Sequence, residues 1–226
     1  MKTIVAVAAH PDDLEFGCSV MVRNLIQKGY IAFYIIATTG ENGSKGEINS
    51  RSARIKIRRM EQLEAARKIG VKEVIFLNFR DGFLEYTENL RRKLTLLIKK
   101  LKPEIVFSFD PANQQFNNLN LFHRDHRAIA LATFDACFAA RNEFIIPSKY
   151  GTHSVQKIFF YGTDKPDYFL NITKDISFKL DVLSSHKSQF SDFKQFTSYF
   201  KENIANNSDR YKYSEAFRVI DVVQIT

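Results

Sequence analysis

Short apolar runs alternate along the chain with longer stretches in which apolar residues recur at helical spacing. The runs predict buried strands, and they cover residues 4–8, 30–37, 73–77 and 105–109. The stretches between them predict helices over residues 18–28, 52–69 and 88–101. Gly29, Gly70 and Pro103 follow these helices, as glycine and proline commonly do at helix ends. Residues 40–52 are polar and rich in glycine, which predicts a loop.

This alternation predicts an α/β fold, in the form of a Rossmann-like three-layer α/β/α arrangement around a mostly parallel sheet. The last third of the chain is less regular. It suggests strands at residues 156–161 and 219–225 and helices at 176–185 and 193–204. We expect these elements to extend the sheet or to cover the site. No repeat or low-complexity linker interrupts the 226 residues, so a single domain over residues 1–226 is expected.

Composition narrows the range of partners. The net charge is +8, but the basic residues are dispersed and alternate with apolar residues, which is typical of solvated helix faces and not of a nucleic-acid site. No apolar run approaches the roughly 20 residues that cross a bilayer, so no membrane span is expected. Two cysteines, Cys18 and Cys137, form no disulfide framework, which favours a reduced, cytoplasmic setting.

Two polar clusters follow predicted strands. His10, Asp12 and Asp13 come directly after the first strand, and a polar loop joins the fourth strand to a second cluster, His123-Arg124-Asp125-His126. The carboxyl ends of parallel strands share one edge of a sheet, so both clusters can converge there. Each alone has an ordinary interpretation, a capped turn or the start of a surface helix. Together they predict an active site.

The residue types in these clusters suit a catalytic metal. His10, Asp13 and His126 supply two nitrogens and one carboxylate, a set that binds zinc and leaves a position open for water. Bound zinc lowers the pKa of that water toward about 7. Fe²⁺ also occupies sites with two histidines and one carboxylate, so it stays an alternative to Zn²⁺.

The remaining polar residues of the clusters suit proton transfer. Asp12, next to the ligand Asp13, can take the proton of the water as a general base. His123 can stabilise an oxyanion or protonate a leaving amine. Asp125 can orient an imidazole by hydrogen bonding.

With these residues in hand, the sequence resembles the PIG-L/LmbE family of zinc-dependent N-acetylglucosaminyl deacetylases over nearly its whole length. Residues 9–17 (AHPDDLEFG) match the first family motif, and residues 123–126 (HRDH) match the second. Shorter stretches add to the resemblance: Arg58 with Glu61, Asp81-Gly82, Lys179, His186-Lys187-Ser188-Gln189 and Glu215-Ala216-Phe217-Arg218.

The resemblance implies the same ligands, base and oxyanion group as the chemistry does, with Asp125 supporting His123. It also adds two substrate-binding residues. Arg58 would reach the pocket and contact the substrate or its acetyl oxygen, the alternative being an ordinary exposed helix arginine. Asp81 would bind sugar hydroxyls, the alternative being a plain turn aspartate before Gly82. His186 is expected to be structural, and His153 has no motif around it. The resemblance also makes a homo-oligomer plausible.

One departure from the family pattern concerns the residues after the first motif. The family usually has a glycine pair where this chain has Cys18 and Ser19. The change puts the shape of the neighbouring pocket wall in question, because glycine permits close backbone approach. A thiol beside a metal would also make the protein sensitive to oxidation if Cys18 were exposed.

The sequence therefore predicts metal-dependent hydrolysis of the acetamide of an N-acetylglucosamine-type sugar or glycoconjugate. A deacetylase of a non-sugar amide with the same site is an alternative, and a metal-free sugar-binding module is an alternative of another class. A nucleotide-binding regulator is disfavoured because no G-x-G-x-x-G follows the first strand. The loops at residues 41–50 and 113–120 are expected to frame the pocket.

Overall fold

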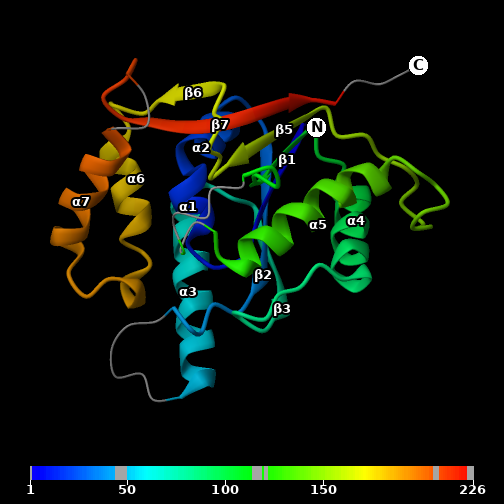
Figure 1. Ribbon diagram of the computed structural model, residues 1–226, viewed down its shortest axis with the longest axis horizontal. Helices are drawn as coiled ribbons and strands as arrows, with labels where there is room; N and C mark the ends of the chain where they lie inside the picture. The colour runs from blue at the N-terminus through cyan, green and yellow to red at the C-terminus, as the bar shows by residue number, and fades with distance from the viewer. Residues whose placement is uncertain (1, 44–49, 114–118, 120–121, 206–208, 223–226) are drawn as a thin grey trace.

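A single mixed sheet forms the centre of the molecule, with helices on both of its faces (Figure 1). The structure is a computed structural model that describes residues 2–43, 50–113, 119, 122–205 and 209–222. Its seven strands have the order β3-β2-β1-β4-β5-β7-β6. The predicted α/β class and mostly parallel sheet are confirmed.

The first five strands run parallel to one another. They are β1 (Thr3–Ala8), β2 (Ile31–Thr38), β3 (Glu73–Phe79), β4 (Ile105–Phe109) and β5 (Lys157–Tyr161). All residues of β1 and β4 are buried, which explains why both strands are continuous apolar runs in the sequence. Each of the four N-terminal strands lies where the hydrophobic pattern predicts one.

The last two strands extend the sheet antiparallel. β7 (Ser214–Asp221) pairs with β5, and β6 (Tyr168–Asn171) pairs with β7. The sequence placed the last strand at residues 219–225, about five residues too late, and gave no strand at β6. β7 begins with the buried polar residues Ser214 and Glu215, so its first two residues carry no apolar signal.

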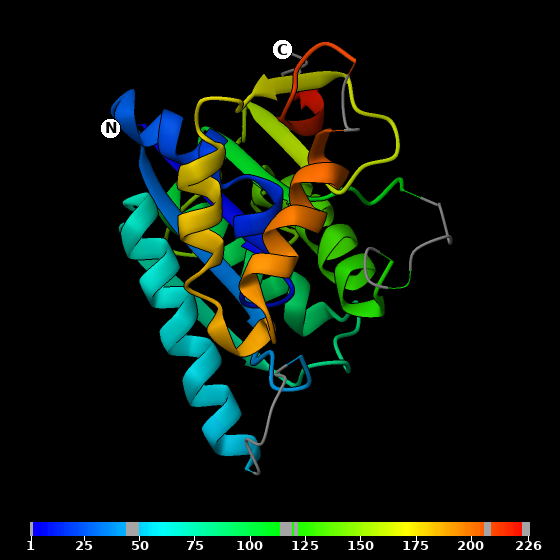
Figure 2. The same cartoon turned by 90° about the vertical axis from the view of Figure 1, so that its left-hand side faces the viewer.

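Helices cover the two faces of the sheet in separate groups. Figure 1 shows α4 and α5 on one side, and Figure 2 shows α3, α6 and α7 across the other. The helices are α1 (Asp13–Gly17), α2 (Ser19–Gln27), α3 (Arg51–Ile69), α4 (Glu88–Leu101), α5 (Arg124–Ala140), α6 (Ile176–Leu183) and α7 (Phe193–Ala205), with a 3₁₀ turn at Lys187–Gln189. None of the described helices is long and apolar enough to span a membrane.

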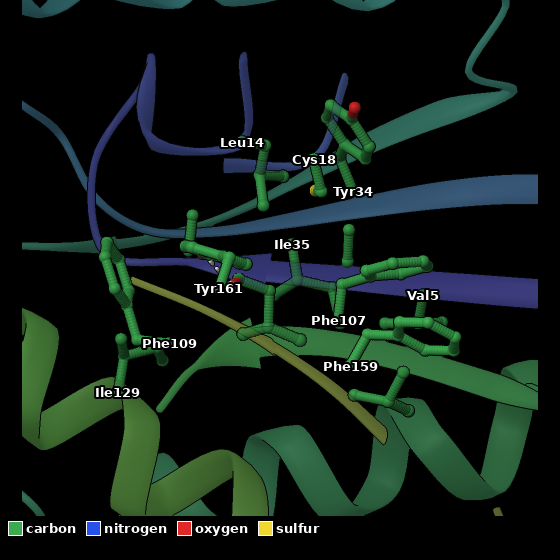
Figure 3. Packing of buried hydrophobic residues seen from close by; sticks show 14 of the residues in the cluster. Val5, Leu14, Cys18, Tyr34, Ile35, Phe107, Phe109, Ile129, Phe159 and Tyr161 are labelled. Atoms are coloured by element: carbon green, nitrogen blue, oxygen red, sulfur yellow. Dashed lines mark hydrogen bonds between the residues drawn. The ribbon is translucent and has the colours of Figure 1, made fainter. Parts of the chain in front are cut away.

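The core lies on both sides of the parallel strands. Figure 3 shows Leu14 and Cys18 on one side of the sheet and Ile129 on the other. The rings of Phe107 and Phe159 stack with their centroids 5.1 Å apart. The hydroxyl of the buried Tyr161 donates to the carbonyl of Val7 (2.8 Å), so the end of β5 is tied to β1 inside the core.

The strand order reverses between β1 and β4. From β1 the chain proceeds outward to β2 and β3, then returns through α4 to place β4 on the other side of β1. Ligands of open α/β sheets bind beyond the carboxyl ends of the strands at such a switch point. The two predicted polar clusters follow β1 and β4, so the topology brings both to this point.

An ion pair between the buried Asp110 and the partly buried Arg218 joins the end of β4 to β7. Both oxygens of Asp110 accept hydrogen bonds from Arg218, at 2.7 Å from Nε and 2.5 Å from Nη2. Thr163 also donates to this carboxylate (2.6 Å). Burial alone raises the pKa of Asp110, but the bonds from Arg218 and Thr163 outweigh it and leave the pKa below its usual value.

Asp110→Asn should therefore destabilise the protein in a pH-dependent way. A lowered pKa means that the pair contributes fully above the ordinary pKa of about 4 and is lost as the pH falls through the folded value. Urea unfolding should show a loss of about 2 kcal/mol at pH 7, since Arg218 is only partly buried. The difference between the two proteins should shrink below about pH 4. A pH-independent difference would contradict the assignment.

Candidate active site

A pocket of about 280 Å³ opens at the switch point. Its walls come from loops after β1, β2 and β3, from the start of α5 and from α3. The lining residues are His10, Asp12, Asp13, Gly40, Asn42, Gly43, Arg58, Asp81, His123, His126 and Gln189. The two clusters predicted from sequence thus meet in one cavity. Of the loops expected to frame it, Asn42 and Gly43 do so, whereas residues 44–49, 114–118 and 120 lie outside the described residues.

Three side chains direct ligand atoms at a common point. Nδ1 of His10 lies 3.1 Å from Nε2 of His126 and 3.4 Å from Oδ2 of Asp13. Oδ1 of Asp13 lies 3.3 Å from Nε2 of His126. Ligands of tetrahedral zinc at about 2.0–2.1 Å stand about 3.3 Å from one another. The three donors therefore have the chemistry and the spacing of three corners of a metal site.

Two carboxylates contact Nε2 of His10, on the side of the imidazole opposite to the candidate ligand atom Nδ1. Its Nε2 lies 3.1 Å from Oδ1 of Asp81 and 3.2 Å from Oδ2 of Asp125. Proton donation from Nε2 to these acceptors leaves the lone pair of Nδ1 free for a metal. Burial lowers the pKa of His10, but the carboxylates of Asp13, Asp125 and Asp81 outweigh burial and hold that pKa well above its usual value.

Asp125 holds the neighbouring loop as well as His10. Its fully buried carboxylate accepts from the backbone N–H groups of Gly82 (2.7 Å) and Leu84 (3.0 Å). The sequence suggested that Asp125 supports His123. In the structure the carboxylate stands 4.0 Å from His123 and is bonded to His10, and it is the backbone N–H of Asp125 that donates to Nδ1 of His123 (3.2 Å). Asp125 therefore orients the predicted ligand by its side chain.

A second possible donor group is His10, His123 and Asp125. The carboxylate of Asp125 already accepts from two backbone N–H groups and from His10, and Nδ1 of His123 accepts from the backbone. The group containing Asp13 and His126 is therefore the better metal site.

The adjacent aspartates face different environments. Oδ2 of Asp12 lies 3.3 Å from both Nη1 and Nη2 of Arg58, whereas Asp13 faces the two histidines. Burial raises the pKa of Asp12, and Arg58 only partly counteracts it. For Asp13, the histidines outweigh burial and hold the pKa well below its usual value. Opposite shifts in two neighbouring carboxyl groups are typical of a division of chemical roles.

Arg58 is a buried member of the pocket wall, only 2% exposed, so the alternative of an exposed helix arginine is wrong. Its guanidinium donates to the carbonyl of Pro11 as well as to Asp12. Close packing here explains Gly40, which has a φ of +67°. A Cβ at Gly40 would lie 2.6 Å from Cδ of Pro11 and 3.0 Å from Nε of Arg58.

His123 precedes α5 and lines the pocket with a partly exposed ring. Burial and the nearby His10 lower its pKa, which favours a neutral imidazole. Because Nδ1 accepts from the backbone N–H of Asp125, the proton of the neutral ring belongs on Nε2. His123 thus has a hydrogen-bond donor to offer to a ligand without being protonated.

Both carboxylate oxygens of Asp81 make contacts with other residues, so Asp81 is more than an ordinary turn aspartate. Oδ1 faces His10, and Oδ2 accepts from the backbone N–H of Asn42 (2.8 Å). It lines the pocket, and contact with a sugar hydroxyl stays a prediction.

The substituted glycine pair lies away from the pocket. Cys18 and Ser19 are fully buried, and neither lines the cavity, so they do not reshape its wall. Burial, with Glu215 nearby, raises the pKa of the Cys18 thiol well above its usual value. The structure therefore does not place an oxidation-sensitive thiol next to the candidate metal site. His153, at 2.7 Å from the carbonyl of Pro103, has a structural role.

Sequence reasoning missed Gln62 and gave Gln189 no role. Gln62 accepts from the backbone N–H of Asp12 (3.0 Å), and Gln189 lines the pocket. The position of Gln62 held a signal, because residues four apart share one face of a helix and Gln62 follows Arg58 by four. Gln189 belongs to the late stretch at residues 186–189 that adds to the family resemblance, and that stretch did not place it in the pocket.

Comparison with known proteins agrees with this geometry. Residues 5–137 match the PIG-L family, whose description is GlcNAc-PI de-N-acetylase. The chain belongs to the PIG-L family. The resemblance inferred from the motifs is confirmed, although Lys179, His186 and Glu215 lie beyond the matched segment.

Relatives of this PIG-L protein include named sugar deacetylases. The chain is 30% identical to a diacetylchitobiose deacetylase of Thermococcus kodakarensis, over 84% of this chain and 71% of that protein. It is 25% identical to a probable N-acetyl-alpha-D-glucosaminyl L-malate deacetylase 2 of Bacillus cereus, over 83% of this chain and 84% of the other. The structure of N,N'-diacetylchitobiose deacetylase from Pyrococcus horikoshii superimposes with a TM-score of 0.87 and 28% identity, covering 97% of this chain and 84% of that one.

Proposed function

We propose that this PIG-L protein hydrolyses the acetamide of an N-acetylglucosamine-type substrate, releasing acetate and a free amine in a metal-dependent reaction. The observation that carries the proposal is the convergence of His10, Asp13 and His126 beside Asp12, whose pKa is raised. The family match and the sugar deacetylases among the relatives support the reaction and the substrate class.

The proposed metal is zinc, held by Nδ1 of His10, Nε2 of His126 and the carboxylate of Asp13. When bound, it supplies a Lewis acid that polarises the acetamide carbonyl and lowers the pKa of water. Fe²⁺ fits the same donor set and is the alternative.

The side chains around the proposed metal site transfer the protons and stabilise the oxyanion. Asp12 takes a proton from the attacking water as the bond to the carbonyl carbon forms. The raised pKa makes its carboxylate a stronger base than an ordinary aspartate. Nε2–H of His123 donates to the oxygen on which negative charge develops. As the C–N bond breaks, the proton held by Asp12 passes to the leaving nitrogen, so that acetic acid and the neutral amine are the immediate products and Asp12 is a carboxylate again. The acid then loses its remaining proton to solvent and leaves as acetate.

Arg58 keeps Asp12 usable as a base. Without this cation, burial would raise the pKa of Asp12 further and so favour the protonated carboxyl group, which cannot accept a proton. We therefore propose that Arg58 acts on the reaction through Asp12. Contact between its guanidinium and the acetyl oxygen is a second proposed role, since Arg58 lines the pocket.

The substrate class can be tested with amine release from a panel of N-acetylglucosamine derivatives, including N,N'-diacetylchitobiose, and of non-sugar acetamides. Zinc-loaded protein should release amine from at least one sugar, and protein stripped by a chelator should release none until zinc is restored. Release from non-sugar acetamides alone would favour the alternative substrate. A zinc-binding protein that releases no amine from any member would contradict the proposal.

Asp12→Asn should lose most of its turnover while binding substrate and zinc as before. The change removes a base and keeps the shape of the side chain, so kcat should fall about 10²- to 10⁴-fold with KM nearly unchanged. Metal content is measured on the same sample. Asp181→Asn, at an exposed carboxylate on α6, is the control and should keep full activity. Loss of zinc from Asp12→Asn would contradict the role of Asp12 as a base.

A further inference from the structure

A buried chain of hydrogen bonds leads from Asp12 to the C-terminal third of the protein. The backbone N–H of Asp12 donates to Oε1 of Gln62 (3.0 Å), and Nε2 of Gln62 donates to Oε1 of Glu15 (2.9 Å). The other oxygen of Glu15 lies 3.2 Å from Nε2 of His186. The side chains of Gln62, Glu15 and His186 are all fully buried. None of the three faces the pocket, so the proposed chemistry gives them no role.

The hydrogen bond between Asp12 and Gln62 involves backbone in an unusual conformation. Asp12 has a φ of 101°, a region that residues other than glycine rarely adopt. Such a conformation persists only where the surrounding structure holds it. Here the peptide group between Pro11 and Asp12 is held on both sides, because Arg58 donates to its carbonyl and Gln62 accepts from its N–H. Both contacts come from neighbouring turns of α3.

Asp12 and Glu15 together determine which way the amide of Gln62 points. The backbone N–H of Asp12 can only donate, so it meets the carbonyl oxygen of Gln62, and the NH₂ group of Gln62 then faces Oε1 of Glu15, which accepts from it. A flipped amide would place its NH₂ against the N–H of Asp12 and its oxygen against Glu15. The N–H of His186 holds the second oxygen of Glu15 and so fixes the carboxylate.

Residues outside the matched family segment anchor this arrangement. Lys179 on α6 donates to the carbonyl of Glu15 (3.0 Å) and to Oε1 of Glu215 (2.6 Å). Glu215 on β7 in turn accepts from the N–H groups of Val20 and Met21 in the first turn of α2. The late sequence signatures at Lys179, His186 and Glu215 therefore converge on the helices that follow Asp12.

We propose that Gln62 is a positioning residue, which clamps the Pro11–Asp12 peptide opposite Arg58 and thereby aims the carboxylate of Asp12, with Glu15 and His186 setting the orientation of its amide. The inference rests on the proposed function, because it takes Asp12 as the base. Misplacement of a reacting group by about 1 Å costs about 100-fold in rate. Loss of the clamp therefore acts on turnover, whereas the metal ligands and the pocket wall stay in place.

The test exchanges the two polar groups of the Gln62–Glu15 contact. In Gln62→Glu, the NH₂ donor to Glu15 is lost and two carboxyl groups face each other, and kcat should fall about 10- to 100-fold with KM and zinc content unchanged. Adding Glu15→Gln restores one amide opposite one carboxylate, with an acceptor still facing Asp12 and another facing His186. The double variant should recover most of the lost kcat.

Two further variants keep the test decisive. Gln62→Met removes both hydrogen bonds at similar volume and should show the same selective loss of kcat, whether or not Gln62→Glu folds well. Thr95→Val removes a buried hydrogen bond on α4 at a residue that does not line the pocket, and it should lower thermal stability without changing kcat.

The proposal is overturned if folded Gln62→Met keeps the kcat of the parent protein. It is also overturned if the double variant folds and binds zinc but stays as slow as Gln62→Glu, because restored complementarity would then have no effect. Failure of the proposed function looks different, since the parent protein itself would release no amine from any sugar. In that case zinc-loaded parent protein is inactive before any change is made at Gln62.

Discussion

The left-handed backbone at Asp12 is the constraint on which the site depends. It lies between a buried strand and α1, and it gives two consecutive carboxylates different partners: Asp13 meets His10 and His126, and Asp12 meets Arg58. An extended or right-handed residue at this position would re-aim both side chains. The parallel sheet supplies the second requirement, because only a shared carboxyl edge at the switch point brings the loop after β1 against the start of α5.

Most of the buried charged groups around this turn are paired with groups of opposite charge or with hydrogen-bond donors. His10 is surrounded by three carboxylates, Asp12 by the guanidinium of Arg58, and Glu215 by Lys179 and two backbone donors. Each group would be costly to bury alone and is stable here because its partner is within hydrogen-bond distance. Burial raises the pKa of Asp12 against the opposing guanidinium of Arg58, whereas the two histidines outweigh burial and lower the pKa of Asp13. The groups around the turn therefore also set its chemistry.

The sequence was informative where structure and chemistry share a local pattern. Apolar runs marked β1 to β4, and their carboxyl ends marked the positions of the two motifs that meet in the pocket. The sequence was not informative where contacts between residues distant in the chain determine the structure. The polar start of β7 is buried because Glu215 meets Lys179, and Asp125 turns to His10 because the loop after β3 supplies two N–H groups. Neither pairing leaves a local signal, and Gln62 acquires its role only once α3 lies against α1.

Calorimetric titration of metal-free protein with zinc most directly tests the division between the two adjacent aspartates. The wild-type chain should bind one zinc ion, and Asp13→Asn should bind it far more weakly because an anionic ligand is lost while the volume of the side chain is kept. Weak binding by Asp13→Asn in a folded protein agrees with a site built from His10, Asp13 and His126. Binding as tight as in the wild type would place the metal on other residues and contradict the account.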